Sequence, residues 1–259
     1  MKRTLTVTDV TRMQEGRVCV AGYDESGNCI RPVLPPPGIH ESSLYAHGRP
    51  IVFPFAVVEY ELLHPDPRPP HTEDWRYEPS SVRFIKRLDE RQQQELLART
   101  LFPSISALFD VPILSDPGHY VLDGQGPRSL GTIRPQRVMR ALYEQSAEGK
   151  WRYRLGFVDG SNASYWLTIT DLTWRYYSDH LGSTGRTPGD ISSHLTSILK
   201  SGDTYLRIGL ARGWQQFPDR CYLQITGVYS FPGFLGDRTF ADFAPGRGRH
   251  GRNPLRSWL

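Results

Sequence analysis

Short apolar runs separated by turn-forming residues dominate the first part of the chain. Residues 4–10 alternate apolar side chains with threonines, which predicts a β-strand. Two further apolar runs within residues 17–37 flank Asp24–Asn28, where Gly27 can take the positive φ that a tight turn needs. We therefore expect a β-hairpin at 17–37.

Residues 51–85 add two more β segments. Residues 51–63 predict a long strand interrupted by Pro54, a residue typical of bulges and sheet edges, and residues 82–85 predict a short strand. The proline-rich stretch 64–70 between them suits neither a helix nor a central strand. Together with the hairpin, these segments indicate a closed unit of about five strands, the count of an OB-fold barrel.

Two helices have clear starting signals. Asp89 followed by Gln92 predicts a capping box at the start of a helix over residues 90–101. Thr187 followed by a proline and by Asp190 predicts a second helix, and an apolar stripe at helical spacing follows it.

The second half repeats the β pattern of the first. Its expected strands are 137–143, 151–158, 164–174, 204–210 and 220–231. The turn-rich stretch 108–135 is where we expect the chain to pass between two domains. The expected fold is mainly β with a few short helices, as two OB-like five-stranded barrels packed in one chain. We place the first barrel and its C-terminal helix at 1–125, the second barrel at 126–243 and a basic Arg/Gly tail at 244–259.

The net charge of +4 is explained by the tail. Residues 244–259 hold four of the 31 basic residues and none of the 27 acidic ones, so 27 of each remain in the body. A neutral body argues against a uniformly basic surface, and composition does not show a basic groove. No apolar segment approaches the ~18 residues of a membrane span, so we expect a soluble, cytoplasmic protein.

Several segments resemble a known family. The hairpin at 17–33, residues 129–133 and residues 165–171 are similar to the N-terminal, middle and later blocks of the prokaryotic dual OB-fold domain proteins. The resemblance covers nearly the whole chain apart from the tail. It implies two OB barrels and nucleic-acid binding, often beside helicases, nucleases or other proteins of antiviral defence or mobile elements.

Candidate nucleic-acid contacts combine aromatic and arginine residues, because bases stack on aromatic rings and arginines bind phosphates. Trp174, Arg175, Tyr176 and Tyr177 have that composition and directly follow an expected strand, so we place them at a strand end or loop. The alternative is that these aromatic rings pack in an ordinary β core.

Arginines elsewhere in the chain are the other candidates. Arg17, Arg31 and Arg134 flank expected strands and suit phosphate contacts or, equally, buried ion pairs. The candidates in the tail, where glycine and arginine alternate, are Arg247, Arg249 and Arg252.

Catalytic and metal signatures are weak. His64, His71, Glu73 and Asp74 have no recognised ligand spacing, and we expect them in a solvated loop. The three cysteines have no metal spacing either, and we expect free thiols. A lone Asp171 suits a helix cap or a turn better than a catalytic acid. We expect no cofactor, no metal and no enzymatic activity, although sequence distance leaves a spatial cluster possible.

Two hypotheses follow for function. The first is a nucleic-acid-binding recognition or adaptor subunit, acting on single-stranded DNA or RNA beside a helicase, nuclease or other partner. The second is a scaffold that binds a protein partner in a nucleic-acid-processing complex, which the neutral body also suits.

Overall fold

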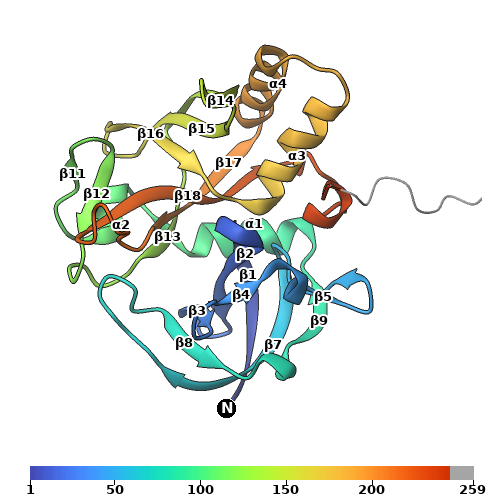
Figure 1. The fold of residues 1–259 in the computed structure, drawn as a ribbon, viewed down its shortest axis with the longest axis vertical. Helices are drawn as coiled ribbons and strands as arrows, with labels where there is room; N and C mark the ends of the chain where they lie inside the picture. Colours follow the sequence, from blue (N-terminus) through green and yellow to red (C-terminus); the bar gives the residue numbers. More distant parts are fainter. Residues whose placement is uncertain (246–259) are drawn as a thin grey trace, which may run out of the picture.

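Two β-sheets, stacked along the long axis of the molecule, make up most of the fold (Figure 1). The computed structural model describes residues 1–245. Within that range the chain is mostly β with four short α-helices, as expected. No helix of the described range is long and apolar enough to cross a membrane.

The first sheet closes into a five-stranded barrel. Its order is β1-β2-β3-β8-β7, and β1 also pairs with β7 to complete the ring. β3 and β8 run parallel, whereas the other neighbours are antiparallel. The strands are β1 (Lys2–Arg12), β2 (Arg17–Asp24), β3 (Cys29–Val33), β7 (Ala56–Pro65) and β8 (Asp74–Tyr77).

Smaller elements complete the first half. They are η1 (Gln14–Gly16), β4 (Ile39–His40), η2 (Glu41–Leu44), β5 (Tyr45–Ala46), β6 (Arg49–Pro50), η3 (Pro79–Ser81), β9 (Arg83–Arg87), α1 (Glu90–Arg99), β10 (Leu101–Phe102) and α2 (Ile105–Phe109).

The hairpin and the first helix form as predicted. Asp24 accepts hydrogen bonds from the backbone N–H groups of Ser26 and Asn28, and Gly27 has φ +83°. Asp89 and Gln92 make the reciprocal capping box of α1.

Two strand predictions in the first half need correction. The strand expected from residue 51 begins only at Ala56, because Phe55 has φ 66° and cannot continue an extended strand. The fifth barrel strand is β8, in a stretch that we expected to be a loop. Strand β9, at the predicted 82–85 segment, pairs with β7 outside the ring.

The second sheet has the same internal strand order, β14-β15-β16-β18-β17, again with its third and fifth strands parallel. Its elements are β11 (Leu114–Ser115), β12 (His119–Leu122), β13 (Leu130–Ile133), β14 (Arg137–Gln145), β15 (Trp151–Val158), β16 (Ser164–Ile169), α3 (Leu172–Ser183), α4 (Pro188–Ser201), β17 (Asp203–Leu210), β18 (Arg220–Phe231) and η4 (Phe240–Asp242). The domain boundary near residue 126 stays a prediction; β10 and β12, which precede it, pair with strands of this sheet.

Helix α4 takes the place of strand pairing at the edge of β14. It begins at the predicted cap, Thr187, which accepts a hydrogen bond from the Asp190 N–H. The hydroxyls of Ser192 and Thr196 accept hydrogen bonds from backbone N–H groups of β14, each at 2.9 Å. The edge amides of this strand are therefore satisfied by helix side chains.

The two sheets meet through buried polar groups as well as apolar ones. The guanidinium of Arg207 on β17 is fully buried and donates to Asp9 of β1 at 2.9 Å and to the Tyr23 hydroxyl of β2 at 2.6 Å. Beside it, Phe55, Leu97 of α1 and Tyr229 belong to one apolar cluster. Burial by itself would lower the pKa of Arg207, but the charge of Asp9 and other neighbouring groups raise it above its ordinary value, so the guanidinium stays protonated.

Candidate functional site

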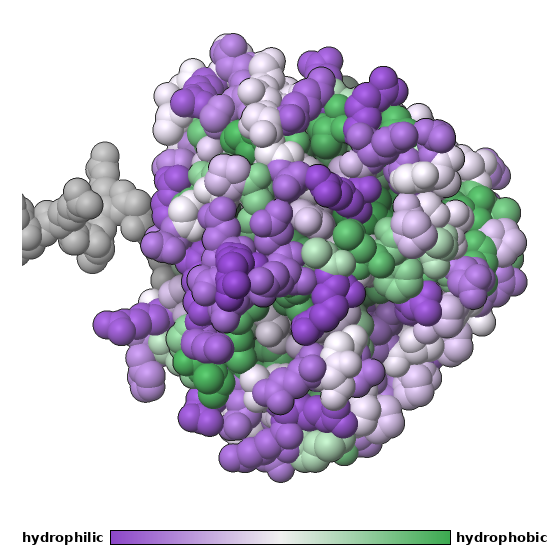
Figure 2. All heavy atoms as spheres, turned by 180° about the vertical axis from the view of Figure 1, so that it is seen from behind, coloured by the Kyte–Doolittle hydropathy of each residue, from purple (hydrophilic) through white to green (hydrophobic). Residues whose placement is uncertain are grey.

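Exposed aromatic side chains narrow the search for a binding site. The face seen in Figure 2 is mostly hydrophilic, with hydrophobic residues showing in limited areas between charged ones. Among residues 1–245, three tryptophans stand out as large exposed hydrophobic residues: Trp151 at 42%, Trp166 at 40% and Trp214 at 54%.

Trp166 lies flat on the outer face of the second sheet. Exposed and buried residues alternate along β16. Ser164, Trp166 and Thr168 are the exposed ones, so Trp166 lies between two polar residues on the solvent-facing side of the strand. Its cross-strand partner is Gly156 of β15. A Cβ at that glycine would stand 2.6 Å from the indole, so only glycine lets the ring lie over the strand.

Two arginines border this indole. Arg140 of β14 pairs with Gly156, the residue beneath the ring, and Arg154 of β15 pairs with Thr168. Residues directly opposite on neighbouring strands share a face. An exposed indole with two arginines on the same face of the sheet therefore lies on the first three strands of the second barrel.

A cleft of about 870 Å³ opens between the two barrels. The first barrel contributes β1, the β1–β2 loop, β3 and the loop between β7 and β8, and the second barrel contributes β18 and the loop between β17 and β18. Arg17 and Arg31, two of the predicted contacts, both line this cleft. Trp214 lines it from the β17–β18 loop.

Arg17 and Arg31 differ in what holds them. Arg17 is partly exposed and pairs with Glu15 at 2.9 Å. Arg31 is 5% exposed, donates from Nε to Asp74 at 2.5 Å and from Nη1 to Ser129, the residue before β13, at 3.1 Å. The alternative of a buried ion pair for Arg31 is therefore confirmed, with a partner, Asp74, that lies in the same barrel.

The expectation of a solvated loop around residues 71–74 is wrong. His71, Glu73 and Asp74 are all buried. Glu73 accepts hydrogen bonds from the backbone N–H groups of Ser129 and Leu130, so this segment ties the barrels together. Within the described range, His, Cys, Asp and Glu residues form no group of three or more that could hold a metal ion.

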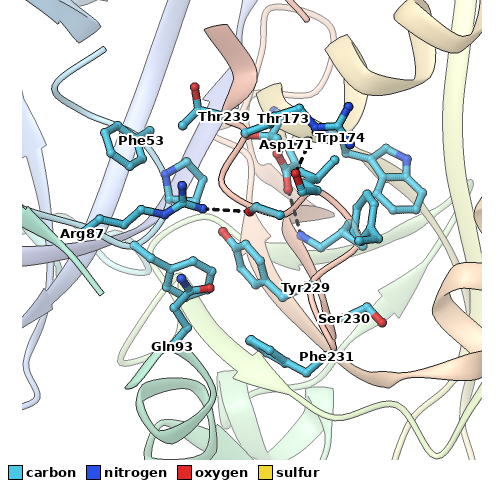
Figure 3. A pocket seen from close by; sticks show the side chains of 18 residues that line it. Phe53, Arg87, Gln93, Asp171, Thr173, Trp174, Tyr229, Ser230, Phe231 and Thr239 are labelled. Atoms are coloured by element: carbon cyan, nitrogen blue, oxygen red, sulfur yellow. Dashed lines mark hydrogen bonds between the residues drawn. The ribbon is translucent and has the colours of Figure 1, made fainter. Parts of the chain in front are cut away.

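A smaller pocket lies where the two barrels meet the C-terminal segment (Figure 3). Figure 3 shows Phe53, Tyr229 and Trp174 around it, and Arg87 donates to the Gly236 and Asp237 carbonyls that cover one side. Its volume is about 80 Å³. That is about half of a ~150 Å³ cavity that holds benzene, so the pocket is too small for a base.

Asp171 is the acidic residue of this pocket, and it caps α3 as predicted. Its carboxylate accepts hydrogen bonds from the backbone N–H groups of Thr173, Trp174 and Val228. Burial raises the pKa of this carboxyl to about 7, against the opposing effect of those three hydrogen bonds.

The expected strand end or loop at residues 174–177 is instead part of helix α3. Because Asp171 satisfies the first free N–H groups, the chain turns into a helix there rather than continuing β16. Trp174, Tyr176 and Tyr177 are 2%, 5% and 8% exposed. The core-packing alternative holds for these three rings, and in this structure they present no face to a base.

The remaining predicted contacts lie apart from the cleft. Arg175 is partly buried, donates to the Ile169 carbonyl and stacks over the Tyr153 ring at 4.9 Å. Arg134 is exposed and pairs with Asp203 on the second sheet. The predicted contacts Arg247, Arg249 and Arg252 lie outside the described residues and stay predictions.

Sequence reasoning missed Trp166 and Trp214. The signal for Trp166 was present, because a tryptophan in the polar phase of an alternating strand faces solvent. The role of Gly156 beneath the indole can be recognised only once the register of β15 and β16 is known.

Comparison with known proteins agrees with this architecture. No curated protein matches the sequence significantly. The model of a family described as the dual OB-containing domain matches residues 4–228, which include both barrel cores up to the last strand. Within each barrel the strands follow the order 1-2-3-5-4. The chain therefore belongs to the dual OB-containing domain family.

Proposed function

We propose that this chain is a non-enzymatic module that binds single-stranded nucleic acid, with a base stacking on Trp166. The observation that carries the proposal is the exposed indole spread over Gly156 and bordered by Arg140 and Arg154. OB folds bind oligonucleotides on the face of their second and third strands, and β15 and β16 are those strands here.

The chemistry favours an unpaired nucleic acid. A base can stack on an exposed indole only when it is not already enclosed in a duplex. One such contact is worth about 1–3 kcal/mol, and neighbouring arginines add phosphate contacts. Stacking needs only an aromatic face, so the site favours single strands without strong sequence preference.

Fluorescence anisotropy with labelled single- and double-stranded DNA and RNA at low salt tests this function. Trp166→Ala should weaken single-strand binding about 5- to 150-fold, the equivalent of about 1–3 kcal/mol. Binding of no nucleic acid by the native protein would reject the proposal.

Trp151→Ala is the matched control. Trp151 is exposed to the same extent as Trp166, but it stacks on Tyr143 at 4.4 Å, at the end of β15. Its removal should leave affinity unchanged. An equal loss in both variants would mean that binding does not depend on the Trp166 face.

An adaptor role beside an enzyme is part of the same proposal, and one edge strand favours a protein partner. Strand β9 pairs with β7 on one side, and no second strand pairs with it among residues 1–245. Its Phe84 and Ile85 are 39% and 42% exposed. A free edge can add a strand from another protein. A stoichiometric partner that co-purifies after nuclease treatment would favour this scaffold function.

A further inference from the structure

The cleft between the barrels concentrates positive charge that composition conceals. Its wall contains six arginines and three aspartates and neither lysine nor glutamate, a local balance of +3. The body as a whole is neutral by count, with 27 basic and 27 acidic residues outside the tail. The cleft is therefore a basic region of a body whose total charge is balanced.

Ion pairing inside the cleft leaves part of that charge uncompensated. Asp66 is shared by Arg76 at 2.7 Å and Arg68 at 3.8 Å. Asp74 is shared in the same way by Arg31 and Arg212. The group of Arg68, Asp66 and Arg76 keeps a net charge of +1, whereas the buried Glu73 also acts on Arg31 and offsets the excess of the other group.

Arg12 adds to this excess. Its guanidinium lies 5.6 Å from the centre of the Tyr176 ring, a cation–π contact that leaves its charge intact. The described residues give it no carboxylate partner within ion-pair distance.

Two buried polar atoms in residues of the same wall also lack hydrogen-bond partners. Nη2 of Arg31 and Nδ1 of His71 make no hydrogen bond, and their residues are 5% and 2% exposed. Burial and the nearby Arg31 and Arg212 charges lower the pKa of His71 to about 2, so its ring is neutral and adds no charge.

The cleft is continuous with the Trp166 face. The solvent-facing side of β16 carries Trp166 and Thr168, and Thr170 continues this alternation just beyond the end of the strand. Thr168 pairs with Gln224 of β18. Thr170 and Gln224 both line the cleft. Four residues at ~3.3 Å each separate Trp166 from the cleft by about 13 Å.

We propose that the cleft holds the sugar–phosphate backbone of the same single-stranded nucleic acid, beyond the segment that stacks on Trp166. This inference rests on the proposed function and extends it to a second, phosphate-binding segment. Trp214 offers a further stacking surface at the far wall, 54% exposed and edge-to-face with Phe217 at 5.8 Å. The bound chain therefore spans both barrels, and its affinity depends on its length.

A length series separates the two segments. Anisotropy is measured with single-stranded oligonucleotides of about 4, 8 and 16 nucleotides, the range of OB-fold site sizes. The variant is Arg12→Ala with Arg68→Ala, two exposed arginines of the cleft. It should bind the shortest oligonucleotide like the native protein and lose affinity for the longest.

Salt titration of the longest complex gives the second readout. Removing two phosphate contacts should reduce the slope of log K against log salt by about 1.4, because each contact contributes about 0.7. The control, Arg83→Ala with Arg91→Ala, removes the same charge from side chains outside the cleft that are 65% and 81% exposed, and should keep the native slope.

The outcomes distinguish the two proposals. If the cleft variant keeps native affinity and slope at all lengths while Trp166→Ala still weakens binding, the cleft segment is wrong and the proposed function stands. Equal losses of affinity in the cleft variant and in the control would also overturn the proposal for the cleft, because the effect would then be one of net charge. If the native protein binds no oligonucleotide of any length, both proposals fail.

Discussion

The two barrels share a strand order but use their first three strands differently. In the first barrel, Asp9 of β1 and Tyr23 of β2 are buried against the second barrel through Arg207. In the second barrel, the third strand, β16, carries Trp166 to solvent. The first barrel thus uses buried side chains of these strands for assembly, whereas the second barrel keeps an aromatic side chain of them exposed.

The barrels also differ in how they satisfy the edge of their first strand. β1 pairs with β7 and closes the ring through backbone hydrogen bonds. β14 instead donates two backbone N–H groups to hydroxyls of α4. A helix can therefore replace a barrel strand when its side chains supply acceptors at the right spacing, here Ser192 and Thr196, four residues apart.

The largest expected effect comes from breaking the assembly face of the first barrel. Arg207→Met removes the guanidinium but leaves the Asp9 carboxylate 2% exposed without its counter-ion. Breaking a buried pair in this way costs about 3–5 kcal/mol. Urea unfolding followed by tryptophan fluorescence measures the loss.

Arg134→Met serves as its control. Arg134 also pairs with an aspartate, but both side chains are about half exposed. Such surface pairs contribute about 0–1 kcal/mol. If the two variants are equally stable, the buried pair does not hold the barrels together.

The closure of the second barrel is tested by Ser192→Ala. The Tyr143 N–H then loses its acceptor in a buried setting, which costs about 1–3 kcal/mol. Amide hydrogen exchange should accelerate at Tyr143. Ser183→Ala, which removes an exposed hydroxyl bonded to the His180 carbonyl, should change stability by no more than about 0.5 kcal/mol. Unchanged exchange at Tyr143 would mean that α4 does not close the edge.

The joint between the barrels should weaken in acid through His71. The unfolded chain protonates this histidine near pH 6.5, whereas the folded pKa is about 2, so the unfolded state binds more protons between these values. Stability therefore falls as pH falls through this window, with a slope of at most roughly 1.4 kcal/mol per pH unit. His71→Gln should flatten the slope.

Two comparisons make that measurement specific. Asp171, whose pKa is raised to about 7, changes stability in the opposite direction over the same window, but equally in the native protein and the variant. His64→Gln, at an exposed histidine, is the control for the loss of an imidazole. If the His71→Gln variant kept the native slope of stability against pH, His71 would have to take up its proton in the folded state.

Local signals made part of the fold predictable. The turn at Asp24–Asn28 and the caps at Asp89 and Thr187 depend on residues within a few positions of one another, and all three form as expected. Strand β8 was missed because its charged residues resemble a loop. Its pairing with β3, more than 40 residues away, is what buries them.

The candidate site was less predictable than the fold, because its properties arise between distant segments. The charge of the cleft depends on pairs such as Arg212 and Asp74, which are separated by 138 residues. The aromatic run at Trp174 suggested a ligand site, although one cap at Asp171 turns it into a buried helix. For Arg31, the sequence predicted either a phosphate contact or a buried ion pair, and the structure shows the ion pair.

The buried pair of Arg207 and Asp9 bears on how such a protein evolves. A barrel separated from its neighbour would expose one member of the pair and the polar groups around it. Neither barrel is thus suited to be copied alone into another gene or joined to a foreign partner. Recombination is expected to move the two together, and a family match that runs through both barrels agrees with inheritance as one indivisible unit.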